Sequence, residues 1–104
     1  MPGAGFVTLA KRSIATPGSE AKIQLTRIPA VEFVVTALHT NDGAVFLGDS
    51  NVAADRYAYR LQPGQSVSLR AYDRPKGKEF FNLDDFYFDV EAANDEICVS
   101  YVPY

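Results

Sequence analysis

The chain has 104 residues, of which 47% are hydrophobic and 22% are charged, and its formal net charge is −3. This length and composition are typical of one soluble globular domain with one modest hydrophobic core. The acidic balance argues against nucleic acid as the main partner, and no apolar run approaches the roughly 20 residues that cross a bilayer. The single cysteine, Cys98, excludes an internal disulfide, and the first residues do not resemble a secretion signal.

The first segment, residues 1–20, is rich in small residues and Gly and has only a weak hydrophobic pattern. We expect it to form an N-terminal arm that becomes ordered against a neighbouring molecule. From residue 21 onward the pattern changes, and we assign residues 21–104 to a single β-sandwich domain.

The rest of the chain alternates between apolar and polar residues, as β-strands do. The alternation is clear in "AKIQLTR" (21–27), "SVSLRAY" (66–72) and "EICVSYV" (96–102). The runs "VEFVVTAL" and "FYFDVEA" are richer in Val, Phe and Tyr, as strands covered on both faces are. We therefore expect about eight strands, at 6–14, 21–28, 31–39, 44–48, 56–61, 65–72, 85–91 and 96–102.

Turn signals separate these strands. "TPGS" (16–19) and "QPGQ" (62–65) each place Pro before Gly, which predicts type II turns. "NDG" (41–43) predicts a tight hairpin. Short strands at this spacing predict an all-β fold, and we expect a single-domain antiparallel β-sandwich of jelly-roll type.

The stretch "AVFLGDSN" (44–51) raises the question of whether Ser50 is a nucleophile. A catalytic serine needs a histidine base oriented by a carboxylate. The only histidine, His39, precedes the serine and ends the strand before "NDG", and nothing downstream of Ser50 is a histidine. We interpret Gly48 as a bend and Asp49, Ser50 and Asn51 as a turn that bonds its own backbone. We predict no catalytic residue and no enzyme activity.

Metal and cofactor sites receive little support. Oxygen donors that could suit calcium are Asn41, Asp42, Asp49, Asn51 and Asp55, but they lack the spacing of a dedicated calcium loop. Cys98 has no second cysteine and no nearby histidine, so we expect a small apolar residue instead of a zinc or redox site. We predict neither a metal nor a cofactor.

Charge and aromatic residues concentrate in the last third of the chain. "RAYDRPKGK" (70–78) has a net charge of +3, and 79–96 contains seven acidic and no basic residues. The acidic run is either a solvated face or one half of a head-to-tail contact between copies in a ring. "KGKEFFNLDDFYF" (76–88) holds too many aromatic residues for all to point inward, so some are candidates for a subunit interface.

The segment "TALHTNDGAVFLGDSNVAADRYAYRLQPGQSVSL" (36–69) resembles a pattern in small virion proteins of tailed bacteriophages. In those proteins "V-[YF]-[VL]-G-D-S-x-V" is followed by "L-x-P-G-x-S-V-x-L". "LDDFYFDVEAANDEICVSYV" (83–102) is similar to their ending, so the resemblance spans about 36–102. It implies that Gly48, Asp49, Ser50, Pro63 and Gly64 are architectural residues. "DRPKGKEFF" and "ADRYAYR" depart from the pattern and leave open which virion surface is bound.

The resemblance implies a β-sandwich virion component, either a capsid cement (decoration) protein or part of a head or tail fibre. We expect a cement protein that stabilises a phage head lattice as a small ring, a homotrimer. Its partner would be the major capsid protein, contacted through the sandwich edge and the N-terminal arm, and its location the virion after synthesis in the host bacterial cytoplasm. The candidate interface residues are Arg74, Lys76, Lys78, Phe80, Phe81, Phe86 and Tyr87.

Two other functions remain open. The first is a glycan-binding module of a phage fibre or spike, for which the exposed-aromatic candidates are Tyr57, Tyr59, Tyr72 and Tyr104. The absence of tryptophan weakens this alternative. The second is the hydrolase built on Ser50, which lacks a visible oxyanion hole.

Overall fold

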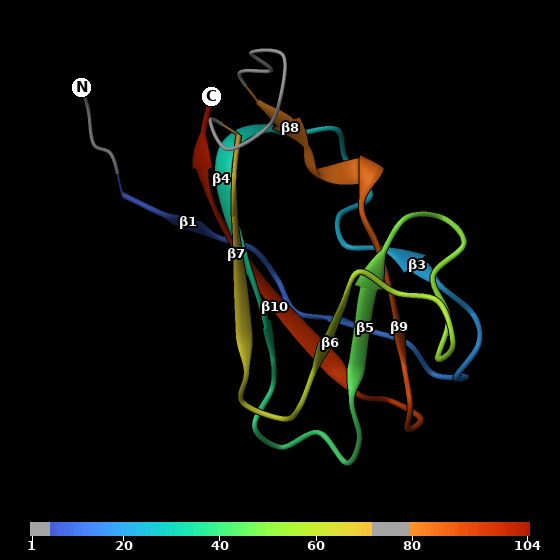
Figure 1. Cartoon of the computed structure of the whole chain (residues 1–104). Coiled ribbons are helices and arrows are strands. Elements are labelled where there is room, and N and C mark those ends of the chain that lie inside the picture. Colours follow the sequence, from blue (N-terminus) through green and yellow to red (C-terminus); the bar gives the residue numbers. More distant parts are fainter. Residues whose placement is uncertain (1–4, 72–79) are drawn as a thin grey trace.

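The computed structural model describes residues 5–71 and 80–104, and these form two antiparallel β-sheets packed face to face (Figure 1). Sheet A contains β1 (Val7–Thr8), β2 (Arg12–Ser13), β4 (Pro29–Ala37), β7 (Ser66–Arg70), β8 (Phe81–Asn82) and β10 (Glu96–Pro103). Sheet B contains β3 (Ala21–Lys22), β5 (Val45–Gly48), β6 (Tyr59–Leu61) and β9 (Tyr87–Val90). One turn of 3₁₀ helix, η3 (Leu83–Asp85), precedes β9.

The strand order confirms the predicted jelly-roll sandwich. Sheet A runs β1-β10-β4-β7, with β2 also on β10 and β8 also on β4, and sheet B runs β3-β9-β5-β6. Successive pairs are therefore nested: β1 and β2 with β10, β3 with β9, β4 with β7, and β5 with β6. A long hairpin folded over on itself in this way is a jelly roll.

The observed strands differ from the predicted ones mainly near the N-terminus. The expected strand at 6–14 is two short strands, both paired with β10 of the same chain. The expected strand at 21–28 ends at Lys22, because residues 23–28 wrap around η3: Ile23 donates a backbone hydrogen bond to Phe86, and Leu83 donates one to Ile28. The pattern also missed β8 and η3, which are too short to show a period.

The two Pro-Gly turns are confirmed. Gly18 and Gly64 have φ of 91° and 88°, and each turn closes with a backbone hydrogen bond from its fourth residue to its first. These are the features of type II turns, in which the third position requires a positive φ.

The predicted hairpin at 41–43 is wrong. β4 lies in sheet A and β5 lies in sheet B, so these residues connect the two sheets instead of closing a hairpin. The carboxylate of Asp95 accepts the backbone N–H groups of Asp42 and Gly43, each at 2.9 Å. Asn41 exchanges two hydrogen bonds with the backbone of Glu96, both at 2.9 Å. The turn is therefore held to the β9–β10 connection.

The hydrophobic core lies between the two sheets. Its largest fully buried side chains are Phe33, Phe88, Ile23, Leu47, Leu83, Ile97, Val35, Val45, Val90 and Val99. One end is an aromatic cluster in which Phe33 contacts Phe81 and Phe86 at centroid distances of 5.3 and 4.8 Å. Burying this apolar area is the main favourable term for folding a sandwich of this size.

Candidate functional site

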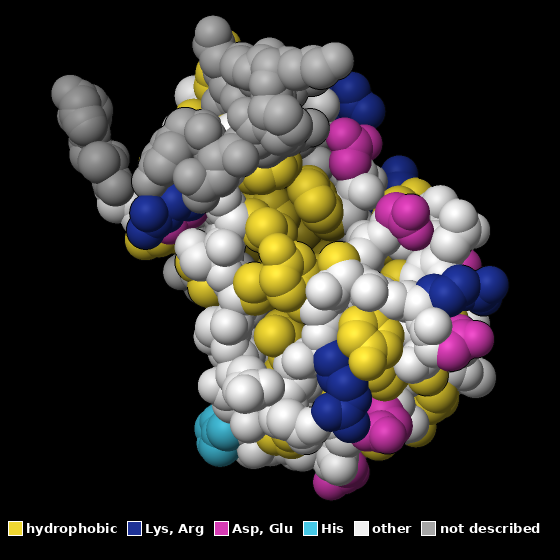
Figure 2. Space-filling model, viewed as in Figure 1, with side chains coloured by type: hydrophobic (Ala, Val, Ile, Leu, Met, Phe, Trp, Pro, Cys, Tyr) yellow, Lys and Arg dark blue, Asp and Glu magenta, His cyan; other side chains and the backbone are white. Residues whose placement is uncertain are grey.

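The sandwich is open along the edge where β6 and β7 face each other. These strands are the edges of sheets B and A, and they come together only near the turn at 62–65 that joins them. Beyond that turn a hollow of about 310 Å³ lies between the sheets. Figure 2 shows it as a band of hydrophobic side chains running into the body of the molecule. Its size is at the lower end of the ~300–1,000 Å³ of small-ligand pockets, enough for one side chain or a small ligand.

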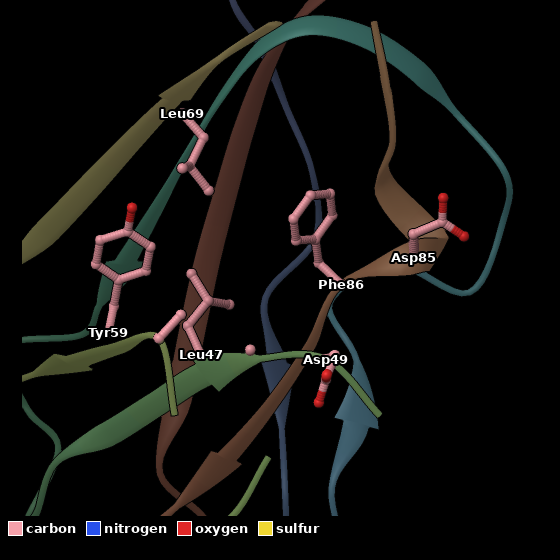
Figure 3. A pocket seen from close by; sticks show the side chains of 8 residues that line it. Leu47, Asp49, Tyr59, Leu69, Asp85 and Phe86 are labelled. Atoms are coloured by element: carbon pink, nitrogen blue, oxygen red, sulfur yellow. The ribbon is translucent and has the colours of Figure 1, made fainter. Parts of the chain in front are cut away.

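The hollow is lined mainly by apolar side chains from four segments. Leu47 lies on β5, Tyr59 on β6 and Leu69 on β7, and Phe86 is the residue that follows η3. Figure 3 shows these four side chains arranged around one space. The wall also includes Gly48, Asp49, Ala58 and Asp85.

Two exposed carboxylates, those of Asp49 and Asp85, stand at the rim of this hollow. Figure 3 places both on the Phe86 side, with their oxygens directed away from the apolar space. Among the described residues that line the hollow, none is basic. These residues therefore give the site an apolar interior with two carboxylates at its rim.

A second hollow, of about 350 Å³, adjoins the first and shares Gly48, Asp49 and Ala58 with it. Its wall adds Asn51, Arg56 and Tyr57. The ring of Tyr57 stacks on Phe46 with 5.3 Å between centroids and 28° between planes, which holds the exposed tyrosine in place. Tyr57 and Tyr59, two of the four tyrosines considered for glycan binding, thus border neighbouring hollows.

An apolar surface lies at the opposite edge of sheet A. β1 projects away from the body of the sandwich (Figure 1), and Phe6 and Val7 are 52% and 40% exposed. Within the described residues β1 pairs only with β10. The pattern of residues 1–20 predicted an arm but did not single out Phe6 and Val7, because their exposure depends on the position of β1 at the edge of sheet A.

His39 and Ser50 lie at opposite ends of β5. His39 precedes this strand, and its Cβ lies 3.8 Å from the position that a Cβ on Gly64 would occupy. Ser50 follows the other end of the strand and is exposed. Four extended residues span about 10 Å, so the pair is not arranged for proton transfer.

The "GDSN" segment forms a local turn, as predicted. The Asp49 carboxylate accepts the backbone N–H of Asn51 at 2.9 Å, and the Asp49 carbonyl accepts that of Val52 at 3.0 Å. A Cβ on Gly48 would meet Val52 Cγ2 at 3.3 Å, so the glycine allows this turn to pack against its own strand.

The acidic run at 79–96 does not form a single solvated face. Asp89 and Asp95 are only 2% and 4% exposed, and their carboxylates accept backbone N–H groups, including that of Gly18 at 3.0 Å. Glu91 accepts the backbone N–H of Ala44 at 3.0 Å, and Asp84 pairs with Arg27 at 3.5 Å. Much of this charge therefore holds connections between strands. Glu79 lies outside the described residues.

The predicted interface residues fall into three groups. Arg74, Lys76 and Lys78 lie outside the described residues. Phe81 is 7% exposed and belongs to the core cluster, so it is a core residue of the single chain. Phe80, Phe86 and Tyr87 are partly buried: Phe80 packs on Tyr104 at 4.4 Å, Phe86 lines the first hollow, and Tyr87 packs on the small cluster around Phe46.

The remaining candidates from the sequence are scattered. Asn41 and Asp42 precede β5 whereas Asp49 and Asn51 follow it, so the oxygen donors considered for calcium do not converge. Among residues 5–71 and 80–104 no group of three or more His, Cys, Asp or Glu side chains could hold a metal ion. Cys98 is half-buried, Tyr104 is exposed, and Tyr72 lies outside the described residues.

Within residues 5–71 and 80–104, no helix has the length and apolar character needed to span a membrane.

Comparison with protein-family models, with curated proteins and with solved structures found no match in any of the three.

Proposed function

We propose that this chain is a structural virion protein, a capsid cement protein that stabilises a phage head lattice as a small ring. Its partner in the lattice would be the major capsid protein. The observation that carries the proposal is the projecting strand β1, which offers Phe6 and Val7 to solvent at an edge of the sandwich. Exposed apolar side chains on an unpaired strand edge are unfavourable in a protein that stays alone in solution.

The rest of the described molecule supports an architectural role. Buried acidic side chains hold connecting segments, and the Asp49 turn satisfies its own backbone. A protein that binds only the assembled shell, and not its free subunits, stabilises that shell by mass action. The gain is RT ln(1 + [L]/Kd), about 4 kcal/mol per site when the free protein exceeds Kd a thousandfold.

The test uses virus particles prepared without the protein. We expect the purified protein to co-sediment with intact particles, to raise the temperature at which their DNA is released, and to appear by electron microscopy as regular added density. Dissociated capsid subunits serve as the control and should bind far less. Particles that neither bind the protein nor gain heat resistance would contradict the proposal.

A second candidate function, glycan binding, is favoured by Tyr57 and Tyr59 beside two adjoining hollows. Flat aromatic rings can stack on sugar rings while nearby carboxylates accept hydroxyl hydrogen bonds. This candidate predicts retention on a polysaccharide column that is lost in Tyr57→Ala and Tyr59→Ala, with Tyr104→Ala as the control. Retention that all three variants keep would place any glycan elsewhere.

A further inference from the structure

We infer that the hollow between β6 and β7 receives the β1 strand of a second copy of this chain, so that sheet A continues from one copy into the next. The inference rests on the ring of the proposed function and names the surfaces that would form it. The occupant of the hollow would be the side chain of Val7.

The first argument is that the two surfaces belong to one sheet but cannot meet within one chain. β1 and β7 are separated by β10 and β4, which is three strand spacings, or about 14 Å. Along residues 66–69, the side of β7 away from β4 has no strand of the described chain beside it. Two unpaired edges of one sheet invite pairing between molecules.

The second argument is the register across sheet A. Val7 is opposite Tyr101, Tyr101 is opposite Phe33, and Phe33 is opposite Leu69. Val7 and Leu69 are therefore the two ends of one row of residues. A closed ring has no rise from copy to copy. A ring axis parallel to the strands thus brings Val7 of one copy beside Leu69 of the next.

The direction of the side chains agrees with this placement. Tyr101 and Leu69 both pack against the core, so the row lies on the face of sheet A that is directed toward sheet B. Val7 shares that face but is 40% exposed in the single chain. In a continuous sheet it would point into the neighbouring hollow, beside Leu69 and Phe86.

Strand direction is also compatible. Each neighbouring pair in the order β1-β10-β4-β7 is antiparallel, so β1 and β7 run in opposite directions and would again pair antiparallel across the junction.

A disulfide trap tests the inference directly. In a Cys98→Ala background, the pair Val7→Cys and Leu69→Cys is too far apart within one chain to bridge, because a disulfide needs Cα atoms about 4.4–6.8 Å apart. Mild oxidation is expected to give covalent oligomers that end at one closed size on a non-reducing gel. The matched control is Leu25→Cys with Leu69→Cys, since Leu25 is 66% exposed and lies outside both surfaces. Trapping no stronger than in this control overturns the inference.

A second test measures assembly without engineered cysteines. Native mass spectrometry and light scattering of the unmodified chain should show a concentration-dependent oligomer. Val7→Glu should raise the concentration needed for half-assembly at least about tenfold, since a buried, unpaired charge costs more than the 1.4 kcal/mol of a tenfold change. Leu25→Glu should leave it unchanged. A chain that is monomeric at all concentrations, or that assembles equally well with Val7→Glu, overturns the inference.

The outcomes separate this inference from the proposed function. A monomer that binds and protects capsids overturns the pairing of β1 with β7 between copies and leaves the cement role intact. A trapped ring that does not bind capsids supports this pairing and contradicts the cement role. A monomer whose hollow binds a polysaccharide, with binding lost in Tyr59→Ala, overturns the pairing of β1 with β7 and supports the glycan-binding function, while the capsid test still decides the cement role.

Discussion

The ring of Phe81 meets the ring of Phe33 edge to face, with 5.3 Å between their centroids and 89° between their planes. Phe81 also contacts Phe86 at 5.4 Å, so the three rings form one end of the core. Truncating such a side chain leaves a cavity, and we expect Phe81→Ala to lower the free energy of unfolding by about 3–5 kcal/mol. Urea denaturation followed by circular dichroism measures this.

The matched control is Phe6→Ala, which removes an exposed ring and should change stability by less than about 0.5 kcal/mol in the monomer. For the same reason Phe81→Asp is expected to unfold the chain and not merely to block assembly, since a carboxylate would be buried among the rings. A folded Phe81→Asp monomer would show that this ring is not part of the core.

Among the acidic side chains, we expect the loss of Asp95 to destabilise the connections between the two sheets most. Asp95→Ala removes the acceptor of two backbone N–H groups, those of Asp42 and Gly43. Hydrogen bonds to charged groups are worth about 1.5–3 kcal/mol each, and partial rescue by water reduces the sum, so we expect a loss of about 2–4 kcal/mol. Hydrogen exchange at the amides of Asp42 and Gly43 should accelerate. Asp85→Ala, at an exposed carboxylate, should change neither; equal effects of the two substitutions would contradict the assignment.

The fold class could be predicted from the sequence because alternation and Pro-Gly turns are local signals. Gln62 to Gln65 contain everything that a type II turn needs, and the turn forms. The connection at 41–43 could not be predicted, because its partner Asp95 is distant in the sequence and is buried only after the sheets pack. A run of acidic residues looks like a solvated surface until the backbone groups that bind it are known.

The candidate site could be predicted from the sequence even less well than the connection at 41–43. The alternation in "SVSLRAY" places Leu69 on an apolar face, but not at an open edge of the sandwich. Only the strand order shows that Leu69 and Val7 end the same row of sheet A. Phe86 was predicted for an interface from the density of aromatic residues, and it lines the hollow, whereas Phe81 from the same run belongs to the core.

Gly64 should tolerate few replacements, and the reason is conformational instead of steric. Its φ is 88°, while the nearest atom to an added Cβ, the Cβ of His39, is 3.8 Å away. We expect Gly64→Ala to cost about 1–2 kcal/mol, because a Cβ is strained at positive φ, and Gly64→Asn to cost less. Gly5→Ala, with no positive φ and nothing within 4 Å, is the control. Thermal unfolding ranks the three variants; a reversed order of Ala and Asn at residue 64 would argue against the turn.

Ser50 and Asp49 separate the turn interpretation from the hydrolase interpretation of the "GDSN" segment. The Asp49 carboxylate accepts the Asn51 N–H at 2.9 Å, so we expect Asp49→Ala to cost about 1 kcal/mol and Asp49→Asn, which keeps an acceptor oxygen, to cost less. Ser50 is exposed at the tip of the turn, and Ser50→Ala should change stability by less than about 0.5 kcal/mol. Its distance from His39 along β5 also predicts that Ser50→Ala leaves any hydrolysis of a chromogenic ester unchanged.

Denaturation curves and an ester assay on the same three preparations check both expectations. Ester hydrolysis that disappears in Ser50→Ala but persists in Asp49→Asn would show that the serine is a nucleophile and that this turn serves to present it.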